Sequence, residues 1–114
     1  VQDIDPDAPL IVDDALKFPR SIIPIPKEKG RDVWHPTQKP VALIRWLIRT
    51  YTDPGDTILD ACIGSGSTAI AAIDEGRHYI GYELNDDSSQ RANSRIARHL
   101  ADRQKRDAQL TLDF

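Results

Sequence analysis

Apolar residues recur at helical spacing in two parts of the chain. The first stripe follows Pro40 and consists of Val41, Ile44, Leu47, Ile48 and Tyr51. This spacing is typical of an amphipathic helix, and Pro40 suits the first turn because its missing N–H would have no partner there. The second stripe, Ala92, Ile96 and Leu100, predicts a helix over 89–109. The polar run NDDSS before it supplies candidate N-caps.

Two shorter apolar runs predict strands on either side of a glycine turn. Residues 57–63 (TILDACI) predict a buried strand with Ile58 and Leu59 at its centre, and the run HYIGYE predicts a second strand. Between them lie the turn GSGS and a predicted helix over 68–75, which Gly76 is placed to cap. The order helix, strand, helix, strand, helix predicts an α/β fold: a parallel βαβ unit with flanking helices.

The N-terminal third is punctuated by prolines, at Pro6, Pro9, Pro19, Pro24, Pro26 and Pro36. Since proline removes a backbone donor and blocks helices, we expect extended or irregular chain there, with at most one short edge strand in SIIPIP and a solvated loop in KEKGRD. We divide the chain into a lead-in over 1–34, a βαβ region over 35–106 and a tail over 107–114. The final LTLDF fits either a frayed end or a short strand.

The composition is that of an ordinary globular domain. The chain has 114 residues, 39% hydrophobic and 29% charged, with a formal net charge of −3, which argues against a general nucleic-acid coat. No apolar run could span a bilayer, and the N-terminal VQDIDPDAPL has no signal-peptide pattern. Cys62 is the single cysteine, so no disulfide, zinc cluster or other metal site is predicted. We expect a cytoplasmic protein with no membrane partner.

The glycine turn carries the clearest chemical signal. GSGSTA matches G-x-G-x-x-G/A, in which a turn between strand and helix lets a ligand approach the backbone. The alternative is a tight turn whose glycines only satisfy positive φ. Glu83, which ends the second strand, suits the two ribose hydroxyls of an adenosine; alternatively it is a solvated side chain.

Asp60 distinguishes two adenosine-containing ligands. It ends the first strand and faces the crevice, where it would repel the pyrophosphate of a nicotinamide cofactor. The same carboxylate complements the ammonium of S-adenosylmethionine. Its alternative role is a cap on the following turn. We therefore favour S-adenosylmethionine as the cofactor over a nicotinamide dinucleotide.

Three segments, HPTQKPVALIRWLIRTY, GDTILDACIGSGSTAIAA and RHYIGYEL, together resemble the C-terminal part of an amino-group DNA methyltransferase. The match is to the permuted class, in which the HPTQKP block precedes the glycine motif, similar to phage and restriction–modification enzymes that methylate the exocyclic amine of adenine or cytosine. The resemblance implies a partial Rossmann-like methyltransferase fold, with residues 35–106 as the S-adenosylmethionine-binding region. It covers roughly residues 17–100.

The resemblance also assigns roles to individual residues. The wall around the methionine end of the cofactor would be formed by His35, Thr37, Gln38, Lys39 and Pro40. The cofactor loop would be formed by Asp60, Ala61, Cys62, Gly64, Ser65, Gly66 and Thr68. Glu83 would hold the ribose and Leu84 would pack near the adenine. Within the block, Lys39 offers a point charge for a carboxylate, although a proline-punctuated helix start also accounts for Pro36 and Pro40.

The chain departs from the family's pattern in one major respect. The catalytic motif is an Asp or Asn followed by two prolines and an aromatic, which holds the flipped target base. No Pro-Pro dipeptide occurs in the sequence, so no catalytic residue is predicted in this chain. Smaller departures are Ala61 and Cys62, where the family usually has proline and phenylalanine, and Asn85, where an aspartate is common.

Two functional hypotheses follow. The first is the cofactor-binding portion of a DNA methyltransferase, inactive alone, which would reach double-stranded DNA through a separate target-recognition part. Its sheet would be completed by a catalytic-half partner chain or in a homodimer, because two parallel strands cannot be covered on their own. The second is a non-catalytic remnant or regulatory module that pairs with an intact methyltransferase. The basic residues of the last predicted helix (Arg91, Arg95, Arg98, Arg103, Lys105, Arg106) are expected to form a solvated face.

Overall fold

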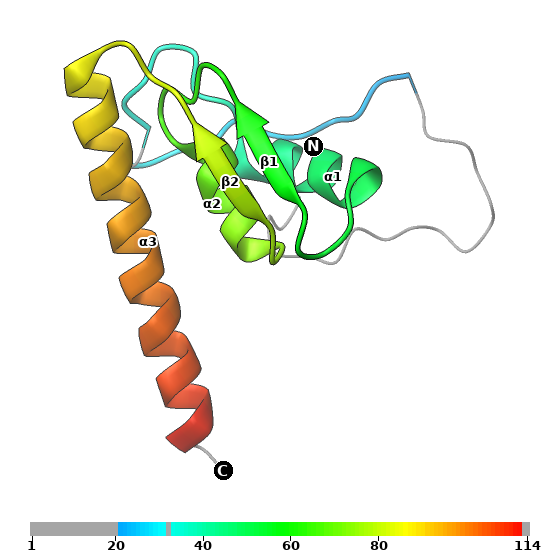
Figure 1. Cartoon of the computed structure of the whole chain (residues 1–114), viewed down its shortest axis with the longest axis vertical. Coiled ribbons are helices and arrows are strands. Elements are labelled where there is room, and N and C mark those ends of the chain that lie inside the picture. The colour runs from blue at the N-terminus through cyan, green and yellow to red at the C-terminus, as the bar shows by residue number, and fades with distance from the viewer. Residues whose placement is uncertain (1–20, 32, 113–114) are drawn as a thin grey trace.

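The computed structural model describes residues 21–31 and 33–112, and contains three helices and two strands in that part of the chain. Their order is α1 (Val41–Tyr51), β1 (Thr57–Asp60), α2 (Ser67–Asp74), β2 (His78–Gly81) and α3 (Asp86–Leu112). The expected order of elements is confirmed (Figure 1). The prolines at positions 6, 9 and 19 lie outside the described residues.

The sheet consists of β1 and β2, paired in parallel from Thr57 opposite His78 to Asp60 opposite Gly81. Both strands are shorter than predicted because the chain turns at the carboxyl end of β1. The pairing is nevertheless extended past the strands: the Ile63 N–H donates to the Tyr82 carbonyl over 2.9 Å. This bond brings the glycine turn back over the end of β2.

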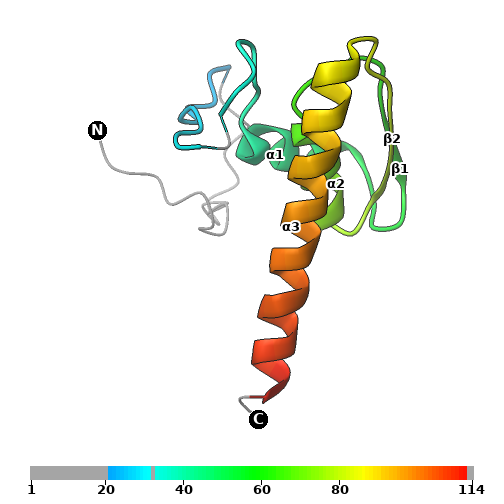
Figure 2. The ribbon, with the colours of Figure 1, turned by 90° about the vertical axis from the view of Figure 1, so that its left-hand side faces the viewer.

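The core lies between the sheet and the helices, in two contiguous clusters. One contains the buried Ile48, Ala71 and Ala72, and the other contains Ala69, Ile70 and Ile96. All three helices lie on the same side of the sheet (Figure 2). The small alanines of α2 let that helix approach both α1 and the strands closely, which positions the turn before it.

The other side of the sheet is open. The prediction that Leu59 lies at the centre of a buried strand is wrong: it is 66% exposed, and its neighbour on β2, Ile80, is 49% exposed. Side chains alternate along a strand, so Ile58 faces the helices while Leu59 faces away from them. No helix in the described part of the chain is long and apolar enough to cross a membrane.

Helix ends agree with the sequence at two positions and differ at a third. Gly76 (φ +70°) ends α2 as predicted, with Arg77 N–H donating to the Ala72 carbonyl and Gly76 N–H to the Ile73 carbonyl. Asn85 caps α3, since its Oδ1 accepts from the Ser88 N–H over 2.9 Å. Helix α3 starts earlier and runs further than predicted, so that residues 110–112 are helical.

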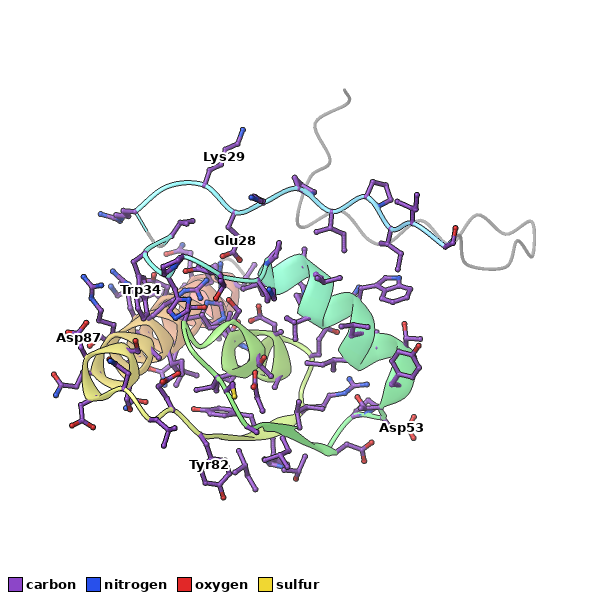
Figure 3. All side chains as sticks on the ribbon, turned by 90° about the horizontal axis from the view of Figure 1, so that it is seen from above. Glu28, Lys29, Trp34, Asp53, Tyr82 and Asp87 are labelled. Carbon is purple, nitrogen blue, oxygen red and sulfur yellow. The ribbon has the colours of Figure 1, made fainter. Side chains whose placement is uncertain are left out.

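Residues 21–26 form no strand, in keeping with the expectation of at most one short edge strand there. Two further expectations are corrected. Glu28, expected in a solvated loop, is half-buried and points into the molecule, whereas Lys29 points away (Figure 3). Arg95, expected on a solvated face, is only 6% exposed. Glu28 and Arg95 are hydrogen-bonded to each other, and Arg95 also donates to the Ser65 carbonyl in the glycine turn.

Candidate functional site

Three segments meet at the carboxyl end of the two strands: the HPTQKP block, the glycine loop over 61–66 and the turn after β2. Such an end of a parallel sheet is where open α/β folds place ligands. Gly64 (φ +50°) and Gly66 (φ +83°) both take left-handed backbone conformations. A Cβ on Gly66 would also lie 3.3 Å from Ile96 Cδ1, so a side chain here would be strained by the backbone conformation and tightly packed against α3.

Asp60 organises the glycine loop. Its Oδ1 accepts from the Cys62 N–H over 3.0 Å, and its Oδ2 accepts from the Thr68 hydroxyl over 2.5 Å. Asp60 therefore caps the turn that follows β1, which is the alternative role considered for it from the sequence. Each carboxylate oxygen has more than one lone pair, so capping leaves capacity for a further donor.

Glu83 ties the end of β2 to the same loop. Its Oε2 accepts from the Gly64 N–H and its Oε1 from the Asn85 N–H, each over 3.0 Å. Glu83 is half-buried and so differs from the solvated alternative. Its neighbour Leu84 is fully exposed at 102% and packs against nothing in the described part of the chain.

The HPTQKP block lies against the glycine loop through His35. The His35 imidazole lies beside Gly64: a Cβ added to this glycine would stand 3.7 Å from His35 Cε1 and Nε2. His35 Nδ1 accepts from the Thr37 N–H over 3.3 Å, and the His35 carbonyl accepts from the Gln38 N–H over 3.1 Å. The block is thus a compact turn, with Thr37 and Lys39 exposed.

The structure therefore brings most of the predicted site residues together. Asp60 is bonded to Thr68 and Glu83 to Gly64, and the His35 imidazole lies beside Gly64. Ser65 and Gly66 are buried beneath it, while Ala61 and Cys62 are exposed on it. The exposed side chains of Thr37, Lys39 and Leu84 are not joined to the loop. Pro40 is the N-cap residue of α1, which places the block directly on a helix start.

Glu28 and Arg95 were missed as site residues from the sequence. The Glu28 carboxylate accepts from the Val41 N–H (2.8 Å) and from Gln38 Nε2 (2.7 Å), and Arg95 Nη2 donates to it over 3.1 Å. A signal was present for Arg95: it lies three positions after Ala92 and next to Ile96, on the buried stripe of α3.

A family model described as DNA methylase, of the N6/N4 methyltransferase type, matches residues 18–94. The chain belongs to this DNA methylase family. YubD of Escherichia coli (strain K12), which carries the name of a methylase, is 44% identical over 63 residues, covering 55% of this chain and 28% of YubD. The DNA adenine methyltransferase YhdJ of the same organism is 47% identical over 53 residues, covering 46% of this chain and 18% of YhdJ.

Solved structures agree with the family assignment. The crystal structure of the M1.HpyAVI–SAM complex is 36% identical with a TM-score of 0.58, covering 66% of this chain and 36% of M1.HpyAVI. The predicted fold class is confirmed as a partial methyltransferase fold, and S-adenosylmethionine is the cofactor of the family. The methylase chain described here spans less than a third of the length of YubD and YhdJ.

Proposed function

We propose that this chain is the S-adenosylmethionine-binding portion of a DNA methyltransferase that methylates the exocyclic amine of adenine or cytosine. It would belong to the permuted class, in which the HPTQKP block precedes the glycine motif. The observation that carries this proposal is the convergence of block, glycine loop and Glu83 at one end of the sheet, in a chain of the DNA methylase family.

The residues at this end fit the cofactor. Gly64 and Gly66 leave the loop backbone open to a ligand, and Asp60 and Glu83 keep acceptor capacity beyond their bonds within the loop. In the proposed arrangement Asp60 accepts from the ammonium, Lys39 pairs with the carboxylate, and Glu83 accepts from the ribose hydroxyls. Leu84 supplies an uncovered apolar side chain for the adenine.

When bound, S-adenosylmethionine supplies a methyl group activated by its sulfonium. The described residues would bind and orient that group, and the hydrogen-bond acceptors for the target amine would come from outside this chain. Double-stranded DNA would be engaged through that other part. No Pro-Pro-aromatic motif occurs in the sequence, which supports this division.

Calorimetry with S-adenosylmethionine and with NAD tests the ligand. We expect saturable binding of S-adenosylmethionine and none of NAD, because a carboxylate at the loop repels a pyrophosphate. Absence of heat with both ligands would remove the cofactor proposal.

The uncovered side of the sheet supports a proposal about association with another chain. We propose that the sheet is completed by a catalytic-half partner or by a second copy of the chain, since parallel sheets are ordinarily covered on both faces. Leu59, Ile80 and Tyr82 form the exposed face, and Tyr82 points away from the helices (Figure 3). Sedimentation velocity tests this; a well-folded monomer at micromolar concentration would refute it.

A non-catalytic remnant or regulatory module is the competing function, favoured by the missing Pro-Pro motif. Two observations distinguish the remnant from the enzyme portion: the sequence encoded immediately upstream of the chain, and a methyl-transfer assay. A Pro-Pro-aromatic motif in that frame supports the enzyme portion, and its absence supports the remnant. Methylation of DNA by this chain alone would contradict both statements.

A further inference from the structure

A buried guanidinium joins both walls of the proposed cofactor site. Arg95 projects from α3, with its side chain 7% exposed. Its Nη1 donates to the Ser65 carbonyl over 3.2 Å and to the Ser67 hydroxyl over 3.0 Å, while its Nη2 donates to Glu28 over 3.1 Å. One planar group therefore contacts the glycine loop, the first turn of α2 and the lead-in segment.

Glu28 carries this contact on to the HPTQKP block. Its Oε2 accepts from both Arg95 and Gln38, and its Oε1 accepts from the Val41 N–H at the start of α1. A carboxylate at a helix N-terminus is favoured by the helix dipole and takes the place of the side-chain cap that Pro40 cannot supply. The block is thus fixed by Glu28 at its Gln38 side chain and at the first N–H of the helix behind it.

We infer that Arg95 and Glu28 are positioning residues, which hold the HPTQKP block and the glycine loop in one arrangement around the methionine half of the cofactor. This inference rests on the proposed function. Neither residue is placed to contact the ligand itself; each acts through Ser65, Gln38 or Val41. The fork of an arginine is needed because a lysine ammonium is a point charge that cannot span the two partners in fixed geometry.

A second polar contact between α2 and α3 serves as a control for the contacts of Arg95. His99 Nε2 lies 2.7 Å from Asp74 Oδ1 and joins α3 to the far end of α2, away from the glycine loop. Asp74→Asn therefore weakens a link between the same two helices without touching the site. If Arg95 only stabilised the packing of α3 on α2, substitutions of Arg95 and of Asp74 would have the same effect on ligand affinity.

The test compares Arg95→Lys and Glu28→Gln with Asp74→Asn in the full chain. Affinity is measured for S-adenosylmethionine and for 5′-methylthioadenosine, which keeps the adenosine and sulfur but lacks the amino-acid group. We expect Arg95→Lys and Glu28→Gln to weaken S-adenosylmethionine binding about tenfold or more, the scale of a lost charge-assisted hydrogen bond. Binding of 5′-methylthioadenosine should change less than about twofold, and Asp74→Asn should leave both ligands within about twofold.

Hydrogen exchange of the ligand-free proteins is the second measurement. Arg95→Lys should speed exchange of the amides at 64–67 together with those of Gln38, Lys39 and Val41, and Asp74→Asn should not. Equal loss of both ligands in all three variants, or exchange unchanged at these amides, would overturn the inference. If the unaltered chain binds no S-adenosylmethionine, the proposed function fails, and the inference fails with it. If the unaltered chain binds and Arg95→Lys binds equally well, the inference alone fails.

Discussion

At Gly81, β2 passes so close to Ile63 that no side chain fits between them. A Cβ at this position would overlap Ile63 Cδ1 and lie 3.1 Å from Ile63 Cβ. Ile63 has little freedom to retreat, because its N–H is bonded to the Tyr82 carbonyl and its side chain packs on the α2 cluster. Because Gly81 has no side chain, the glycine loop can lie directly against the end of the sheet. Gly81 therefore influences the position of the loop although it does not line the site.

Gly81→Ala should lower the free energy of unfolding by about 1–3 kcal/mol, the usual scale of overpacking in a fixed core. Urea unfolding gives the value. Ile63→Val in the Gly81→Ala background removes the overlapping methyl and should recover part of the loss. A Gly81→Ala protein as stable as the original would show that the two segments can separate at no cost.

Asp60 and Asp56 flank β1 at its two ends and form a matched pair for testing the proposed ammonium contact. Asp60 lies at the glycine loop, whereas Asp56 accepts from the Asp53 N–H at the opposite end. Asp60→Asn should weaken S-adenosylmethionine binding about tenfold or more, since a hydrogen bond to a charged group is lost. Asp56→Asn should leave it unchanged; calorimetry distinguishes the two, and equal affinities would contradict the assignment of Asp60.

Among the elements, α1 and α2 are joined by a carboxylate held between two guanidiniums. Glu75, at the end of α2, accepts from Arg45 Nε and Arg49 Nε, each over 2.6 Å, and its side chain is 9% exposed. Burial alone would raise the pKa of Glu75, but the hydrogen bonds from Arg49 and Arg45 outweigh it and hold the pKa below its ordinary value. The hydrogen bond to Glu75 likewise raises the pKa of Arg49.

This link makes stability depend on pH in a defined direction. Because the folded-state pKa of Glu75 is lowered, its contribution is complete above the ordinary value of 4.5 and is lost as pH falls through the folded-state value. Glu75→Gln should therefore cost about 1–3 kcal/mol at neutral pH and progressively less below pH 4.5.

Urea unfolding across this pH range, with Asp87→Asn as the control, measures the effect. The exposed Asp87 lies 3.9 Å from Arg91, and such surface pairs contribute little. A Glu75→Gln deficit that stays constant down to about pH 3 would contradict the role of its ionised form.

Element order was predictable from the sequence because apolar spacing and turn residues are local signals. Helix α1 begins and ends as expected from Val41 to Tyr51, and Gly76 caps α2. The exposure of Leu59 was not predictable, since a β-strand pattern does not say which of its faces is covered. The pairing of Glu28 with Arg95 was hidden for a similar reason: each is an ordinary charged residue until the fold brings them together.

For the molecule as a whole, the helices gather on one side of the sheet and leave the other bare (Figure 2). Leu59 and Ile80 lie opposite each other on this bare face. An exposed apolar face of this kind is typical of a surface that is covered by another part of a protein.

Replacing both Leu59 and Ile80 with threonine should abolish the proposed association while leaving the melting temperature nearly unchanged, since threonine keeps a high strand propensity. Sedimentation velocity at micromolar concentration measures the first effect, and thermal unfolding the second. Ile58→Thr, on the covered face, is the control and should lower the melting temperature instead. Association that persists in the double variant would place the contact elsewhere.

The contact between Glu28 and Arg95 joins positions 67 apart in the chain, whereas β1, α2 and β2 follow one another directly. Closing a long loop is entropically costly and slow compared with forming adjacent elements. We therefore expect the βαβ unit to form first and residues 28–31 and 33–41 to dock onto it last. The segment should also be the first to detach, so that a ligand held between it and the glycine loop would slow unfolding by blocking its earliest step.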